Sequence, residues 1–90
     1  MNHATIWAAI DRVAIRLRMT RSGLARHCGM DATAFNKSKR FDKYGKPHWP
    51  SCITVSKVML FAHLSPEEFG RIISEAEQDL AQQNGTATVA

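Results

Sequence analysis

The 90-residue sequence has few cysteines and no long run of apolar residues. A helix that crosses a bilayer needs about 20 consecutive apolar residues, and no segment approaches that length. The start, MNHATIWAAIDR, also lacks a basic leader. Cys28 and Cys52 would pair only in an oxidising compartment, so we expect both to stay reduced. These absences predict a cytoplasmic chain with no membrane contact.

The sequence also lacks the usual signatures of catalysis and cofactor binding. It contains neither a G-x-S-x-G motif nor a glycine-rich phosphate loop. The neighbours His27 and Cys28, followed much later by His48 and Cys52, do not have the spacing of a zinc site. We therefore expect no enzyme activity, no catalytic residue, no metal, no cofactor and no small-molecule substrate.

Acidic residues are scarce in the first part of the chain. Residues 1–63 carry 11 lysines and arginines against three aspartates, a net charge of +8, whereas residues 64–90 carry −4. A basic surface binds polyanions by releasing counterions from a phosphate backbone. The alternative is a solvated surface on an ordinary basic protein. Ninety residues suit a single all-α domain, which we place at 1–83, with 84–90 as a flexible tail or the start of a linker.

Periodic apolar residues predict helices at both ends of that domain. A stripe formed by Ile6, Ile10, Val13 and Leu17 indicates an amphipathic helix over about 5–18. Near the other end, Ser65 and Glu68 form a capping box with Pro66 in the first helical position. They predict a last helix that begins there.

Three shorter helices are predicted between these two. Thr20 is a good N-cap for the second helix, Asp31 for a third helix that ends near Ser38, and Ser51 marks the start of the fourth. Gly45 and Pro47 exclude a continuous helix through 39–50. The fourth helix ends at His63, a residue type that tolerates the left-handed conformation.

The segment LARHCGMDATAFNK has the pattern of a helix-turn-helix. Leu24, Ala25 and Cys28 share one helical face, and Gly29 can end that helix in the left-handed conformation. Phe35 then anchors the following helix in the core. Its outer face is small and polar, suited to a DNA major groove: Ala32, Thr33, Asn36 and Lys37.

Over residues 5–70 the chain resembles the lambda-repressor-like helix-turn-helix DNA-binding domains. FNKSKR, the following Gly and Pro, and WPS most resemble the amino-terminal domains of phage-type repressors that carry a LexA-like peptidase domain. The resemblance implies an all-α fold of five helices, with helices 2 and 3 as the helix-turn-helix. It also implies a nucleoid-associated transcriptional regulator, a repressor that binds an inverted repeat in double-stranded DNA as a homodimer.

The resemblance also implies roles for individual residues. The base-reading positions are Ala32, Thr33, Asn36 and Lys37, and the DNA backbone contacts are Arg21, Lys39, Arg40, Lys43 and Lys46. Ser38 departs from the family, whose members keep an apolar residue there, so we expect the third helix to end early and Phe41 to fill the gap. The amino terminus lacks the basic arm that some phage repressors wrap around DNA.

Several alternatives remain open at the level of the sequence. The apolar stripe with Ile73, Ala76 and Leu80 can form a dimer interface or cover the first helix. The aromatic loop with Tyr44 and Trp49 can stack on unpaired bases, although a tryptophan before a proline is more often a packing residue. The main alternative to a DNA-binding function is a protein-interaction module, such as an antitoxin or adaptor, on the same scaffold.

Overall fold

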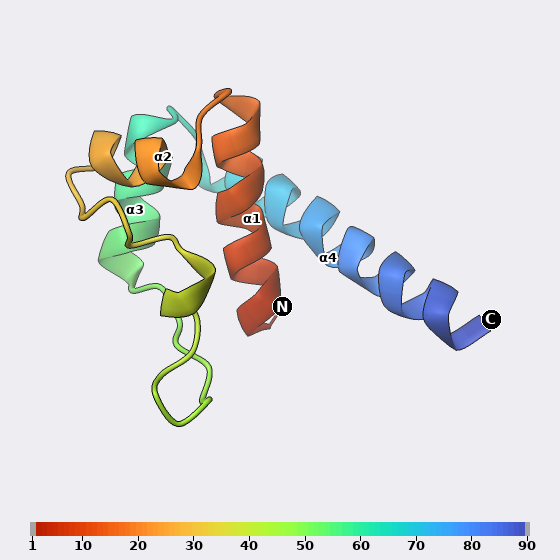
Figure 1. Cartoon of the computed structure of the whole chain (residues 1–90). Coiled ribbons are helices and arrows are strands. Elements are labelled where there is room, and N and C mark those ends of the chain that lie inside the picture. Colours follow the sequence, from red (N-terminus) through yellow and green to blue (C-terminus); the bar gives the residue numbers. More distant parts are fainter. Residues whose placement is uncertain (1, 90) are drawn as a thin grey trace.

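The computed structural model describes the backbone of residues 2–89 and the side chains of residues 2–83. Its elements are α1 (His3–Arg16), α2 (Arg21–His27), the 3-10 helix η1 (Lys37–Lys39), α3 (Cys52–Phe61) and α4 (Pro66–Val89). Figure 1 shows α1 between α2 and α3 on one side and α4 on the other, with the chain after η1 forming a projecting loop. The predicted all-α class is confirmed. In the described residues, no helix is long and apolar enough to cross a membrane.

The core forms around α1. The predicted stripe is buried, with Ile10 and Val13 each 1% exposed, and Leu17 packs against it from the end of the helix. Trp7, which the stripe did not include, is also buried. The residues that meet this face from the other elements are Leu24, Ala25, Phe35, Val58, Phe69 and Ile72. One buried cluster thus joins α1 to α2, α3, α4 and the segment that contains Phe35.

The predicted helix ends are confirmed where a side chain defines them. Thr20 Oγ1 accepts a hydrogen bond from the Gly23 N–H at 3.0 Å, and Ser51 Oγ accepts one from the Thr54 N–H at 3.1 Å. The Ser65–Glu68 capping box forms in both directions, at 3.1 and 3.2 Å. These caps pair N–H groups that a helix cannot satisfy within its own first turn.

Two helix ends require a left-handed backbone, as predicted. Gly29 has a φ of 74° after α2, and His63 has a φ of 56° after α3. Arg18, for which the sequence gave no signal, also has a φ of 56° between α1 and α2. These residues turn the chain sharply after α1, α2 and α3, so that the segment that follows each helix returns to the core.

The predicted third helix is wrong, and the described residues contain four α-helices rather than five. Residues 32–36 form turns, and only Lys37–Lys39 form a 3-10 helix. Asp31 caps the Thr33 N–H at 2.9 Å, as an N-cap would, but Asn36 has an extended backbone with a ψ of 149°. Thr, Asn and Ser side chains favour such local turns over a helix interior.

Phe35 alone fills the core position of this segment. It is 0% exposed, whereas Phe41 is 52% exposed and does not fill the gap beside Ser38. The prediction that Phe41 replaces the apolar residue that relatives have at the position of Ser38 is therefore wrong. Because Phe35 is anchored without an α-helix around it, its side chain carries much of the attachment of residues 31–39 to the core.

The α4 helix packs along α1 and extends past it (Figure 1). Its backbone is helical through Val89, beyond residue 83 where we expected the folded domain to end. The role of residues 84–90 as a flexible tail or linker stays a prediction, because their side chains and residue 90 lie outside the described residues.

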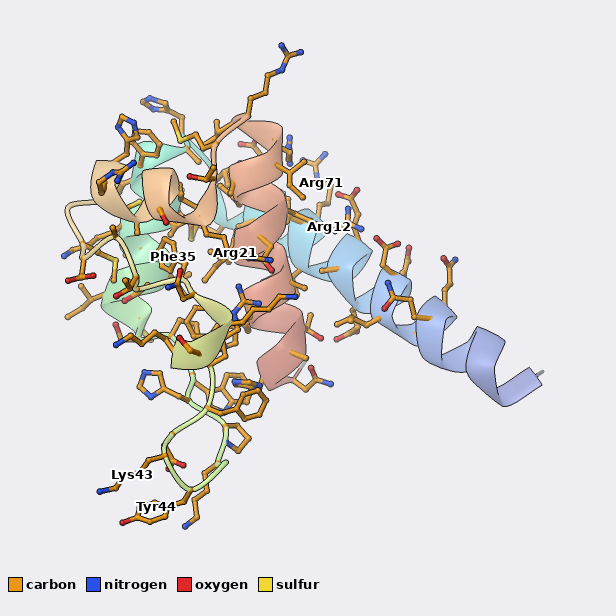
Figure 2. The ribbon with its side chains drawn as sticks, viewed as in Figure 1. Arg12, Arg21, Phe35, Lys43, Tyr44 and Arg71 are labelled. Atoms are coloured by element: carbon orange, nitrogen blue, oxygen red, sulfur yellow. The ribbon has the colours of Figure 1, made fainter. Side chains whose placement is uncertain are left out.

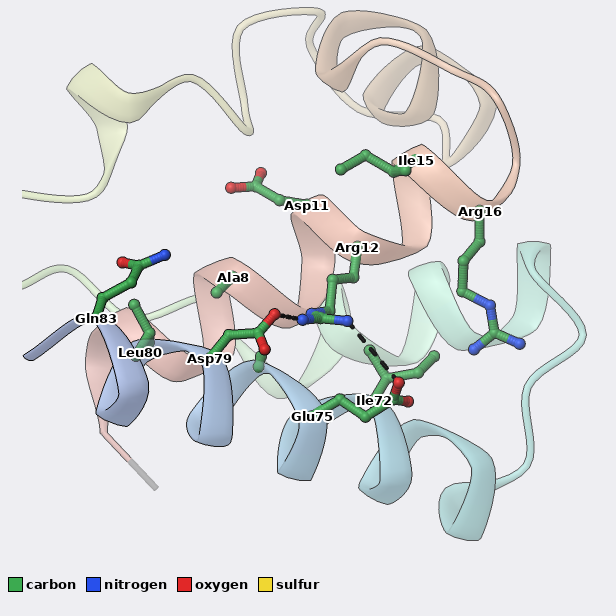
Figure 3. A pocket seen from close by; sticks show the side chains of 11 residues that line it. Ala8, Asp11, Arg12, Ile15, Arg16, Ile72, Glu75, Asp79, Leu80 and Gln83 are labelled. Atoms are coloured by element: carbon green, nitrogen blue, oxygen red, sulfur yellow. Dashed lines mark ion pairs between the residues drawn. The ribbon is translucent and has the colours of Figure 1, made fainter. Parts of the chain in front are cut away.

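The apolar stripe of α4 mainly covers α1. Ala76 is 1% exposed within the single chain, so its expected place in a dimer interface is wrong. Ile73 is half-buried against the core, and Leu80 lines a groove of about 710 Å³ between the two helices. Figure 3 shows this groove, in which Arg12 pairs with Asp79 and lies 3.8 Å from Glu75. Within the single chain, Ala76 and Ile73 thus cover the core around the first helix, and a dimer contact through Leu80 stays a prediction.

Both cysteines are free thiols, in agreement with the expectation that they do not pair. Cys28 is buried at the end of α2, and this burial raises the pKa of its thiol. Cys52 is exposed at the start of α3. The fold is therefore held by packing and hydrogen bonds in the residues that the structure describes.

Replacing Phe35 by alanine should test how strongly residues 31–39 depend on one side chain. Loss of a fully buried phenylalanine should lower the free energy of unfolding by about 3–5 kcal/mol, measured by urea denaturation. The matched control is Ile15→Ala, because Ile15 is 72% exposed and its loss should change stability by less than about 0.5 kcal/mol. Equal effects of the two substitutions would contradict the packing described here.

Candidate nucleic-acid interface

Most residues that the sequence nominated for nucleic-acid contact lie in one continuous stretch, residues 31–46, here called the basic segment. Thr33, Lys37 and Lys39 are exposed, and Ala32 and Asn36 are half-buried. Farther along, Lys43 and Lys46 are exposed in the loop after η1. The structure thus brings the nominated base-contacting residues together with most of the nominated phosphate contacts, although not on an α-helix.

Successive tight turns define the first half of the basic segment. The Ala34 N–H donates to the Asp31 carbonyl at 2.9 Å, and the Asn36 N–H donates to the Thr33 carbonyl at 3.0 Å. The Asp31 carboxylate also accepts hydrogen bonds from the Thr33 N–H at 2.9 Å and from the Thr33 hydroxyl at 2.7 Å. These two bonds lower the pKa of the Asp31 carboxyl group. Thr33 and Asn36 are therefore presented by turns with fixed backbone hydrogen bonds.

Asp11 of α1 joins the basic segment to two helices. Its Oδ1 accepts hydrogen bonds from Arg21 Nε at 2.8 Å and from Arg40 Nη2 at 2.7 Å. Its Oδ2 accepts a further bond from Arg40 Nη1 at 3.1 Å. Arg21 begins α2 and Arg40 follows η1, so one carboxylate links three elements. Two arginines around one aspartate leave this cluster with a net positive charge.

The two arginines of this cluster differ in exposure. The Arg40 side chain is 11% exposed, its guanidinium lies 5.1 Å from the Trp7 ring centroid, and Nη2 also donates to the Phe35 carbonyl at 3.1 Å. The Arg21 side chain is 42% exposed. Arg40 is thus an internal support of the basic segment, whereas Arg21 still presents guanidinium N–H groups to solvent.

This arrangement changes the acidity of the groups involved. Burial raises the pKa of Asp11, but the hydrogen bonds and charges of Arg40 and Arg21 outweigh it and hold that pKa below its ordinary value. The hydrogen bond with Asp11 correspondingly raises the pKa of Arg21. Asp11 therefore stays ionised, and the cluster keeps its charges, over the neutral pH range.

The loop after η1 is a small hairpin, residues 40–48. The His48 N–H donates to the Arg40 carbonyl at 2.8 Å, and the Asp42 N–H donates to the Lys46 carbonyl at 2.8 Å. An isolated antiparallel bridge joins Phe41 and Pro47 between these bonds. Lys43 and Lys46 are thus held at the end of an ordered hairpin rather than on an irregular loop.

Two residues of α1 that the sequence did not nominate fix the base of this hairpin. His3 Nε2 lies 2.6 Å from the Arg40 carbonyl oxygen and 3.1 Å from that of His48, so a proton on this nitrogen serves both acceptors. Trp7 Nε1 donates to the His48 carbonyl at 2.9 Å. Neither residue belongs to a motif, and the amphipathic pattern of α1 gave no sign of this role.

The aromatic residues at the base also pack on His3. Its ring centroid lies 5.0 Å from that of Phe41 and 5.9 Å from that of Trp49. This contact agrees with the interpretation of Trp49 as a packing residue that anchors the loop. Among the described residues, no group of three or more His, Cys, Asp and Glu side chains is arranged to hold a metal ion.

Comparisons of the chain with protein-family models, with curated proteins and with solved structures found no match. Function therefore has to be argued from the geometry and charge of the site.

The Asp11 cluster predicts a specific dependence of stability on pH. Because folding lowers the pKa of Asp11 from its ordinary value of 3.8, its contribution to stability is present above about pH 4 and is lost as the pH falls further. In Asp11→Asn, this part of the acid-induced loss should disappear. The variant should also be about 1–3 kcal/mol less stable at pH 7.

Urea denaturation at pH values from 3 to 7 would measure both effects. The control is Glu67→Gln, which removes an exposed carboxylate of α4 and should leave the pH profile close to that of the unmodified protein. An Asp11→Asn profile parallel to that of the unmodified protein would show that the cluster does not link folding to protonation.

Proposed function

We propose that this chain binds double-stranded DNA through its basic segment and regulates transcription. The proposal rests on the observation that one set of residues anchors this segment and a different set is exposed. Phe35 and Arg40 attach it to the core, whereas Lys37, Lys39 and Thr33 stay exposed and carry no part of that attachment. A rigid, cation-rich surface of this kind suits a phosphate backbone.

The proposed contacts fall into two classes. Lys37 and Lys39, together with Arg21, neutralise phosphates, because Arg21 uses its Nε and Nη2 groups for Asp11 and keeps other N–H donors free of that carboxylate. Thr33 and Asn36 read base edges, with Ala32 allowing close approach. Arg40 is left out of the phosphate contacts, because its guanidinium is enclosed by Asp11, Trp7 and the Phe35 carbonyl.

We further propose that α2 and the first half of the basic segment act together as the helix-turn-helix unit. Three features support this: buried Leu24 and Ala25 on α2, the left-handed Gly29 between the two parts, and buried Phe35 in the second part. The second part consists of turns, so its polar side chains reach the DNA from successive turns rather than from one helical face.

Regulation as a repressor on an inverted repeat also remains part of the proposal. It requires two copies on one operator. Leu80 and Ala76 of the nominated dimer set line the groove between α1 and α4, and of these two Leu80 is half-buried whereas Ala76 is buried. Selection of bound sequences from a pool of randomised duplex DNA tests this directly. Two half-sites about one helical turn apart would show a dimer, and a single half-site would show a monomer. No enrichment at any salt concentration would contradict sequence-specific binding.

A charge-removing variant tests the assignment of Lys37. Lys37→Gln should weaken duplex binding and reduce the slope of log affinity against log salt concentration by about 0.9, the value for one lost phosphate contact. The measurement is fluorescence anisotropy at several salt concentrations. Arg71→Gln is the matched control, because Arg71 is exposed on α4, on the other side of α1, and its loss should leave the slope unchanged (Figure 2). Equal slopes for both variants would remove Lys37 from the interface.

One observation favours the alternative of a protein-interaction module. Ile53 and Leu60 lie seven residues apart on α3, hence on one helical face, and are 69% and 75% exposed. The double variant Ile53→Ser with Leu60→Ser separates the two functions. It should leave duplex binding unchanged under the DNA proposal, whereas a partner protein that docks on α3 would lose its affinity.

A further inference from the structure

The hairpin of residues 40–48 projects from the domain without contributing to its core. All residues from Phe41 to Trp49 are exposed, and Figure 2 shows Lys43 and Tyr44 at its free end, away from the helices. Long exposed loops add chain entropy to the unfolded state and no buried apolar area, so the fold itself gives no reason for this one. The exposed end of the hairpin therefore indicates a role other than stabilising the fold.

The free end is nevertheless ordered by its own hydrogen bonds. Asp42 Oδ1 accepts the N–H groups of Tyr44 and Lys46 at 2.8 and 2.9 Å, and the Gly45 N–H donates to the Asp42 carbonyl at 3.0 Å. Gly45 has a φ of 81°, a conformation that favours glycine. The tip is thus a defined turn, supported at its base by His3 and Trp7, and it loses little freedom on binding.

These bonds also determine what the tip presents. Asp42 lies just before the tip, residues 43–46, and is the only acidic residue of the hairpin; its carboxylate accepts backbone N–H groups of the turn. Two cations and one aromatic ring remain, with Lys43 Nζ lying 5.1 Å from the centroid of the Tyr44 ring. Tyr44 is 76% exposed and carries a hydroxyl group that donates or accepts a hydrogen bond. The tip is therefore positive, narrow and polar at its end.

We propose that this tip, Lys43–Lys46, enters the minor groove of duplex DNA beside the site contacted by residues 32–39. The inference rests on the proposed function, because the basic segment brings the DNA to the hairpin. The minor groove is about 6 Å wide, so the tip side chains enter it while the two-stranded body of the hairpin stays outside. Tyr44 lies four positions after Arg40, so the strand between them spans up to about 13 Å, a length comparable to half a helical turn of about 17 Å.

The chemistry of the groove indicates which sequences the tip favours. A·T pairs give a narrower minor groove with a more negative potential, which attracts lysine side chains. They present only acceptors there, for which the lysine ammonium groups and the Tyr44 hydroxyl are donors. A G·C pair adds an amino group that blocks this approach. The hairpin thus selects A·T-rich DNA next to the site that the first half of the segment reads.

The test uses three duplexes of equal length that share one selected site for residues 32–39 and differ only in the pairs beside that site, which are A·T, G·C or inosine·C. Inosine is guanosine without its minor-groove amino group, so an I·C pair resembles A·T in the minor groove and G·C in the major groove. The unmodified protein should bind A·T and I·C duplexes equally, and G·C at least about fivefold more weakly. Affinities similar for I·C and G·C, both weaker than A·T, would place the contact in the major groove and overturn the proposal.

A triple variant, Lys43→Gln with Tyr44→Ala and Lys46→Gln, then locates the effect. It should lose the preference for A·T and I·C, and its salt slope should fall by about 1.8, while the far-ultraviolet circular dichroism stays unchanged. The control Arg71→Gln should keep the preference. A triple variant that retains the preference would overturn the hairpin assignment alone, whereas an unmodified protein that binds none of the duplexes would overturn the proposed function as well. A preference of the unmodified protein for single strands, lost in the triple variant, would assign the tip to base stacking instead.

Discussion

The bond network around Asp11 is the constraint on which the candidate interface depends. Residues 31–48 contain only a short 3-10 helix and one isolated bridge, so regular secondary structure does little to place them. Instead, the Asp11 carboxylate on α1 binds Arg40. The guanidinium of Arg40 also lies over the Trp7 ring and donates a hydrogen bond to the Phe35 carbonyl. Asp11 matches the charge of this enclosed arginine, and the Nη1 and Nη2 groups have acceptors, whereas the buried Nε has none among the described residues. The position of the basic segment is therefore set by Asp11 of α1 through Arg40, together with the buried Phe35.

Much of the fold follows from local signals in the sequence. The α1 stripe, the Thr20 and Ser51 caps and the Ser65–Glu68 capping box each depend on residues within one or two turns of each other, and all are confirmed. The prediction of a third helix was wrong for a local reason that the spacing of apolar residues does not include. Asp31 and Thr33 bond to each other and to their own backbone, and this competes with the helical ladder.

The candidate site was harder to predict, because its roles are decided by residues distant in sequence. In the sequence, Arg21 and Arg40 look alike as cations of the basic residues 1–63, yet Arg40 is enclosed beside a carboxylate 29 positions earlier. Ala76 likewise was assigned to a dimer surface when α1 already covers it. No pattern in α1 predicts that His3 and Trp7 hold the base of the hairpin, because their side chains contact backbone carbonyls about 40 positions away in the sequence.

The unequal distribution of charge has a consequence for the approach to a polyanion. The positive charge of residues 1–63 and the negative charge of residues 64–90 lie on different elements, and two of the α4 acids, Glu75 and Asp79, face Arg12 of α1. The hairpin side of the molecule is therefore more positive than the α4 side. Under the proposed function, the field of a DNA duplex would rotate the molecule before contact, so that the hairpin side leads. At low salt this orientation raises the fraction of productive encounters, and at physiological ionic strength it acts only within a Debye length of about 8 Å.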